Sequence, residues 1–123
     1  MLIIRTQQLQ AFAATAERDF LRRLARAVRR HFPAATQALP EEELLAEVEV
    51  RVEQARGHGL TWESSIADFV GFTFDVGPGF DSHPSVRLVL EDPALPPDRR
   101  MERLTRELPP HVWSSVRVFT GTP

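Results

Sequence analysis

The sequence predicts a mainly α-helical fold, a compact single domain of about four to five helices with a long first helix. Two observations predict it. Apolar residues recur at spacings of three and four along most of the chain, and proline or glycine interrupts these periodic segments at their ends. The chain has 123 residues, of which 42% are apolar and 26% charged, as in an average soluble globular protein with one core.

The first helix is expected over residues 6–32, with Thr6 as its N-cap and Pro33 as its stop. One face carries an apolar stripe at helical spacing: Leu9, Phe12, Ala13, Ala16, Phe20, Leu24, Ala27 and Val28. Another face carries basic residues three or four apart: Arg18, Arg22, Arg26 and Arg29.

The later helices are expected at 41–56, 62–76 and 97–108. Pro40 precedes the first of these segments, Pro97 begins the last, and Thr61 is the expected N-cap of the middle one. The segment 84–91 fits a short helix, but its alternating apolar residues also fit a strand. The apolar arc of 62–76 is wider than one stripe, which predicts a helix that is centrally buried or covered by a partner.

The end of the chain has a different pattern. Residues 1–108 form the predicted helical body, and residues 109–123 form a valine-rich tail. In HVWSSVRVF, apolar residues alternate with period two, which predicts a strand or a loose segment. Residues 2–4 are also strand-like, so the two termini could form a short β pairing.

Charge is nearly balanced overall and segregated along the chain. The net charge is −2, which argues against nucleic-acid binding. Residues 1–33 carry seven arginines against two acidic residues, whereas residues 40–63 carry seven glutamates against two arginines. The arginine row could be a solvated face, could pair with the glutamate-rich second helix, or could recognise an acidic partner protein.

Few residues are equipped for catalysis or metal binding. The chain has no cysteine, which excludes thiolate chemistry and fits a reducing, cytoplasmic compartment. Its histidines lie outside metal-binding spacings, and nucleotide-loop and serine-elbow motifs are absent, so we expect no metal, cofactor or catalytic residue. No apolar run is long enough to span a membrane, and the first residues show no secretory signal.

One segment offers a weaker enzymatic alternative. Asp75, Asp81 and His83 lie around the Gly77-Pro78-Gly79 break. Two carboxylates and a histidine could act as a small hydrolase-like acid–base site if they converged in a cleft. A helix stop followed by a capping turn explains the same residues without catalysis.

Five strings in a fixed order resemble a known family. They are MLIIRTQQLQAF at the start, RRHFP at 29–33, GHGLT at 57–61, FDVGPGFD at 74–81 and LEDPALPPDRRMERL at 90–104. Together they resemble the short cytoplasmic accessory proteins encoded beside spike and PAAR-type effector genes in bacterial type VI secretion loci. The resemblance spans about residues 1–105, and the tail after Leu108 departs from the family pattern.

The resemblance implies an accessory role, as an adaptor or co-chaperone that helps load an effector onto the secretion spike. The expected partner-binding residues are aromatic anchors and orienting arginines: Phe72, Phe80, Trp113, Arg18, Arg22, Arg26 and Arg29. The partner would be the effector, its chaperone or a spike protein. The alternative is an immunity protein that presents its 41–53 glutamate cluster to a toxin.

Overall fold

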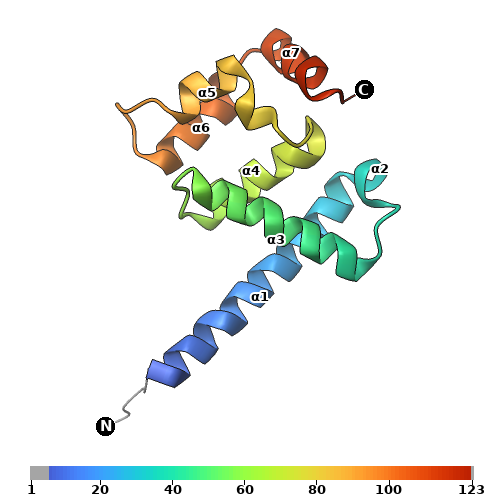
Figure 1. Cartoon of the computed structure of the whole chain (residues 1–123), viewed down its shortest axis with the longest axis vertical. Helices are drawn as coiled ribbons and strands as arrows, with labels where there is room; N and C mark the ends of the chain where they lie inside the picture. The colour runs from blue at the N-terminus through green and yellow to red at the C-terminus, as the bar shows by residue number, and fades with distance from the viewer. Residues whose placement is uncertain (1–5, 123) are drawn as a thin grey trace. The chain divides into compact units, whose positions relative to one another are not determined.

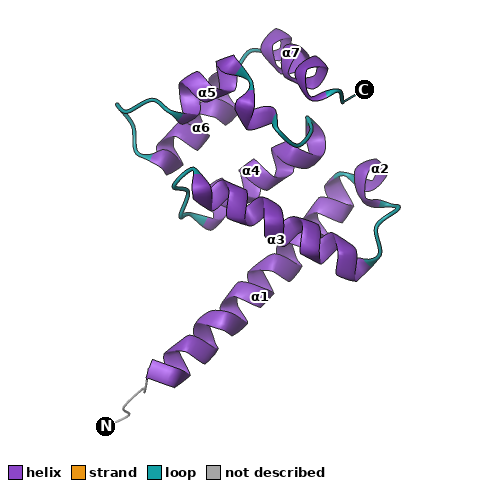
Figure 2. Cartoon of the chain, in the orientation of Figure 1, coloured by secondary structure: helices purple, strands orange, loops and turns teal. Residues whose placement is uncertain are grey.

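A computed structural model of the chain describes residues 6–122, with side chains from residue 8 onward. These residues form helices and connecting loops and contain no strand, so the mainly α prediction is confirmed (Figures 1 and 2). The described α-helices are α1 (Thr6–His31), α2 (Pro33–Thr36), α3 (Glu41–Gly57), α4 (Glu63–Asp75), α5 (Pro84–Leu90), α6 (Pro97–Glu107) and α7 (Pro110–Thr120). A 3₁₀ turn, η1 (Phe80–Ser82), lies between α4 and α5.

The long first helix and the helices expected at 41–56, 62–76 and 97–108 are confirmed to within a residue or so at each end. Segment 84–91, which fitted either a helix or a strand, is helix α5. Proline stands at the start of α2, α5, α6 and α7, where its missing N–H costs no helical hydrogen bond.

The expectation of a strand-like or loose tail is wrong, because residues 110–120 form helix α7. Pro110 occupies the first turn, and Gly121 ends the helix with a left-handed φ of 74°. Val112, Val116 and Phe119 are spaced by four and three residues, so the alternating run also satisfies a helical stripe. The predicted β pairing therefore lacks its C-terminal strand, and residues 2–4 lie outside the described residues.

The described residues form seven α-helices and not the predicted four to five, because α2 and α7 are additional to the expected segments. Helix α2 is a single turn after Pro33, and the Thr36 hydroxyl donates to the carbonyl of Phe32 at 2.9 Å. The expected N-cap at Thr6 concerns a side chain outside the described part of the chain.

The chain divides into two compact units, one ending at Val48 and the other beginning at Glu49 within α3. A single domain over residues 1–123 therefore stays a prediction. In the first unit α1 contacts α2, and the buried apolar residues of α1 start at Phe20. In the second unit α6 contacts α4 and α5, while α7 and α5 contact η1. The largest buried side chains there are Phe69, Phe80, Met101 and Leu104.

Candidate protein-binding surfaces

The N-terminal half of α1 carries exposed apolar side chains. Leu9 is 54% exposed and Phe12 is 67% exposed, and Ala13 and Ala16 on the same stripe are exposed as well. The stripe is buried only farther along, where Phe20 is 6% exposed. The sequence predicted the stripe but not this division, because periodicity shows which face of a helix is apolar and not what covers it.

The four predicted arginines of α1 have two different environments. Arg18, Arg22 and Arg26 are exposed, whereas Arg29 is half-buried. The Arg29 guanidinium donates to the carbonyls of Thr36 at 3.1 Å and Leu39 at 2.6 Å. These bonds hold the segment between α1 and α3, so Arg29 is a structural residue of the first unit in addition to any role in binding.

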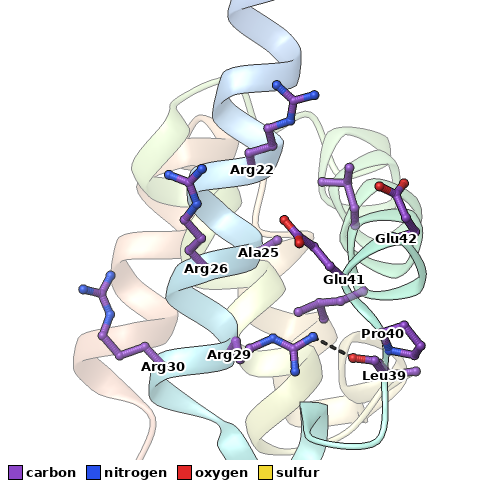
Figure 3. Close-up of a pocket in the computed structure, with 11 residues that line it drawn as sticks. Arg22, Ala25, Arg26, Arg29, Arg30, Leu39, Pro40, Glu41 and Glu42 are labelled. Carbon is purple, nitrogen blue, oxygen red and sulfur yellow. Dashed lines mark hydrogen bonds between the residues drawn. The ribbon is translucent and has the colours of Figure 1, made fainter.

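An open pocket of about 1000 Å³ lies beside this arginine row, between α1 and the first turn of α3 (Figure 3). Arg22, Arg26 and Arg30 come from successive turns of α1, and Glu41 and Glu42 come from α3. Among the described residues, none of these five side chains has a hydrogen-bond or ion-pair partner. The hypothesis that the exposed arginines pair directly with the start of the glutamate-rich helix is therefore not met at these positions.

The three predicted aromatic residues lie together in the second unit. The rings of Phe72 and Trp113 stack at 4.6 Å between centroids, and those of Phe72 and Phe80 lie 5.5 Å apart. Phe80 is fully buried and also packs on Phe69, whereas Phe72 and Trp113 are half-buried. Phe80 is thus a core residue, and Phe72 and Trp113 are the members of this cluster that reach the surface.

Asp75, Asp81 and His83 are each held by a different partner. Asp75 pairs with Arg117 at 2.8 Å, and a carboxylate oxygen of Asp81 lies 2.8 Å from Nε2 of His58. The hydrogen bond from His58 lowers the pKa of Asp81 below its usual value and outweighs the effect of burial.

His83 is the N-cap of α5. Its Nδ1 accepts from the backbone N–H of Ser85 at 3.1 Å, and its Nε2 lies 3.2 Å from the Ser115 hydroxyl. The side-chain hydrogen bonds of Asp75, Asp81 and His83 within the described residues therefore connect η1 and its flanks to neighbouring elements, and none joins one of the three to another. No group of three or more potential metal ligands occurs among residues 6–122.

The buried carboxylate of Asp98 was not identified from the sequence. It accepts hydrogen bonds from the backbone N–H groups of Thr61 and Trp62 at 3.1 and 3.0 Å and from the Thr61 hydroxyl at 2.9 Å. The expected N-cap role of Thr61 is therefore wrong: Trp62 is the N-cap, and the Thr61 hydroxyl donates to Asp98. Burial raises the pKa of Asp98, but the bonds from Trp62 and Thr61 outweigh it and bring that pKa below its ordinary value.

Comparisons with known proteins identify no relative of this chain. No protein-family model, curated protein or solved structure gives a significant match to the chain. Each helix among residues 6–122 is too short or too polar to span a bilayer.

Proposed function

We propose that this protein is a non-catalytic accessory protein that binds another polypeptide, as an adaptor or co-chaperone in the loading of a type VI secretion effector. The observation that carries the protein-binding role is the exposed apolar row on the N-terminal half of α1. Loading of an effector is taken from the sequence resemblance, and the row supplies the physical means of binding.

An amphipathic helix with anchors at i, i+3, i+4 and i+7 suits docking into an apolar groove of a partner. Leu9, Phe12, Ala13 and Ala16 have this spacing, and their exposed area is unfavourable in water until a partner covers it. Arg18 follows within the next turn and is exposed, so an acidic rim on the partner's groove would fix the orientation of the helix.

The half-buried pair of Phe72 and Trp113 offers a second, smaller contact. Their stacked rings expose part of a rigid aromatic surface, and aromatic residues are frequent binding hot spots. We assign them a supporting role, because a half-buried pair that also packs on the core has less surface to give a partner than the row on α1.

The test uses an effector or spike protein encoded at the same locus and measures its binding to the purified chain by calorimetry. Replacing Leu9→Glu together with Phe12→Glu should weaken binding by about a hundredfold, because two apolar anchors are lost from the interface. The matched control is Leu88→Glu with Val118→Glu. Those side chains are 77% and 81% exposed and belong neither to the row on α1 nor to the Phe72–Trp113 pair, so binding should be unchanged.

Equal binding by both double variants would show that α1 is not the docking helix. No binding by the wild-type chain to any effector, chaperone or spike protein of its locus would contradict the adaptor role itself. In a strain lacking the protein, an effector that is still toxic when produced inside a cell but is no longer delivered would support the loading role.

An immunity role is the second candidate, and the exposed glutamates at the start of α3 favour it. Glu41, Glu42 and Glu43 are exposed and begin the acidic cluster over 41–53. An acidic face suits inhibition of a toxin with a basic active site. Co-expression with the toxin separates the two roles, because an immunity protein protects the cell by itself and a loading factor does not.

A further inference from the structure

We propose that the face formed by α1 and the first turn of α3 binds the same face of a second copy of this chain, giving a two-fold symmetric dimer. The observation behind this proposal is the pocket in Figure 3, where a basic row and an acidic pair line the same hollow and, within the described part of the chain, form no direct ion pair.

The charges lining the pocket determine which occupant fits. The lining also holds Arg29, whose guanidinium is already bound to two backbone carbonyls. The other three arginines, Arg22, Arg26 and Arg30, would attract an anionic group, but the two glutamates, Glu41 and Glu42, would repel it. A purely basic segment would be attracted by the glutamates but repelled by the arginines. The fitting occupant therefore carries both signs, side by side and at matching spacing, and this chain presents such an arrangement on its own surface.

Symmetry makes the face complementary to itself. A two-fold axis that runs between the two rows and parallel to α1 places the arginine row of each copy over the glutamate pair of the other. The arginines of one copy then contact the glutamates of the second copy, and the glutamates of the first contact the arginines of the second, as isologous interfaces require. An axis perpendicular to α1 in the plane of the interface would instead bring like charges together, so the charges select a parallel arrangement of the two α1 helices.

The apolar lining of the pocket gives this contact an apolar component. It includes the buried side chains of Ala25 and Leu44 and the half-buried side chains of Leu39 and Leu45. The aliphatic stems of long arginine side chains pack well on such a surface while their guanidinium groups bind carboxylates. An anionic small molecule would gain the arginine contacts alone and would keep the repulsion from both glutamates.

The test measures the mass of the full chain by sedimentation equilibrium over a range of concentrations. We expect the wild type to form a dimer that weakens as ionic strength rises, because added salt shortens the Debye length from about 30 Å at about 0.01 M to about 3 Å at about 1 M. Two variants with reversed charge probe the face: Arg22→Glu with Arg26→Glu, and Glu41→Arg with Glu42→Arg. Each alone should weaken the dimer by about tenfold or more, because like charges then face each other.

The decisive sample is an equimolar mixture of the two reversed variants. In the symmetric arrangement the mainly acidic face of one variant then lies over the all-basic face of the other. The mixture should therefore form a heterodimer, although each variant alone dimerises at least about tenfold more weakly than the wild type. The matched control, Arg87→Glu with Arg106→Glu, changes the net charge equally on exposed residues of the second unit and should dimerise like the wild type.

Three results would overturn the proposal: a wild type that stays monomeric at all concentrations, a dimer that the reversed variants do not weaken, or a mixture that does not associate. Circular dichroism of each variant checks that the helices remain. If a reversed variant fails to fold, a neutral pair at the same positions replaces it, Arg22→Gln with Arg26→Gln or Glu41→Gln with Glu42→Gln, and the dimer must again weaken.

Discussion

Asp98 lies in the first turn of α6 and binds the backbone that leads into α4, so one carboxylate connects two helices of the second unit. Replacing Asp98→Ala leaves the N–H groups of Thr61 and Trp62 without this acceptor. The free energy of unfolding should fall by about 2–3 kcal/mol, since hydrogen bonds to a charged group are among the stronger ones. Urea unfolding followed by circular dichroism measures this change.

The control for that variant is Glu102→Ala on the same helix. Glu102 pairs with Arg99 at 2.9 Å at the surface, and such pairs contribute about 1 kcal/mol or less. Equal destabilisation by the two substitutions would contradict the capping role of Asp98.

The lowered pKa of Asp98 and that of Asp81 predict how stability depends on pH. A carboxyl whose pKa is lower in the folded state stabilises the fold above its unfolded pKa of about 3.9, and this contribution is lost as pH falls through the folded pKa. The free energy of unfolding should therefore decline below about pH 4. Asp98→Asn should reduce the steepness of that decline, and urea titrations at stepped pH values measure it. A decline parallel to that of the wild type would exclude Asp98 as a source.

At the scale of the element, α1 carries two phenylalanines that differ in burial and so allow a matched comparison of stability. Phe12 and Phe20 are the same residue type on one helix, but Phe12 is 67% exposed and Phe20 is 6% exposed. Phe20→Ala should cost about 3–5 kcal/mol of unfolding free energy, as for other buried phenylalanines. Phe12→Ala should change it by about 0.5 kcal/mol or less. Comparable losses at both positions in urea unfolding would show that the N-terminal half of α1 is packed in solution.

The end of α7 packs on the turn that follows α4, and two glycines test this contact. Gly77 has a φ of 108°, and a Cβ there would overlap the side chains of Thr120 and Thr122. Gly79 has a φ of 86° and open space around it. Gly79→Ala should cost about 1–2 kcal/mol from backbone strain alone. Gly77→Ala should cost about 1–3 kcal/mol more, because the α7 end must move.

Thermal and urea unfolding of the two alanine variants compare these costs directly. Equal losses would mean that α7 does not press on Gly77. Retained helical signal with a lower midpoint for Gly77→Ala is the expected result.

At the scale of the whole molecule, the sequence was most informative where one signal dominated. Proline and glycine placed the ends of α3, α4 and α6, because these residues constrain the backbone regardless of tertiary contacts. The prediction for the tail was wrong because residues 111–119 fit a period of two and a helical stripe equally well. Pro110 at the start and Gly121 at the end are the residues that indicate a helix. Asp98 could not be predicted, since its donors lie 36 and 37 residues away in sequence.

The residue types of the candidate binding surface could be read from the sequence, but their burial and contacts could not. Phe72, Phe80 and Trp113 do lie together, although helix periodicity gave no reason to expect contact between residues 41 positions apart. The burial of Phe80 and the backbone bonds of Arg29 depend on chain segments distant from them. Spacing predicts a face, and only tertiary structure shows whether that face is free.

The uncovered half of α1 has a consequence for the motions of the chain. Backbone amides over residues 10–17 have little tertiary packing to protect them, so they should exchange with deuterium much faster than those following Phe20. A protein that binds this segment would have to hold it in one helical conformation, and the entropy lost in ordering it would lower the affinity. The resulting complex would form and dissociate readily, as the proposed loading role requires of a factor that releases its effector.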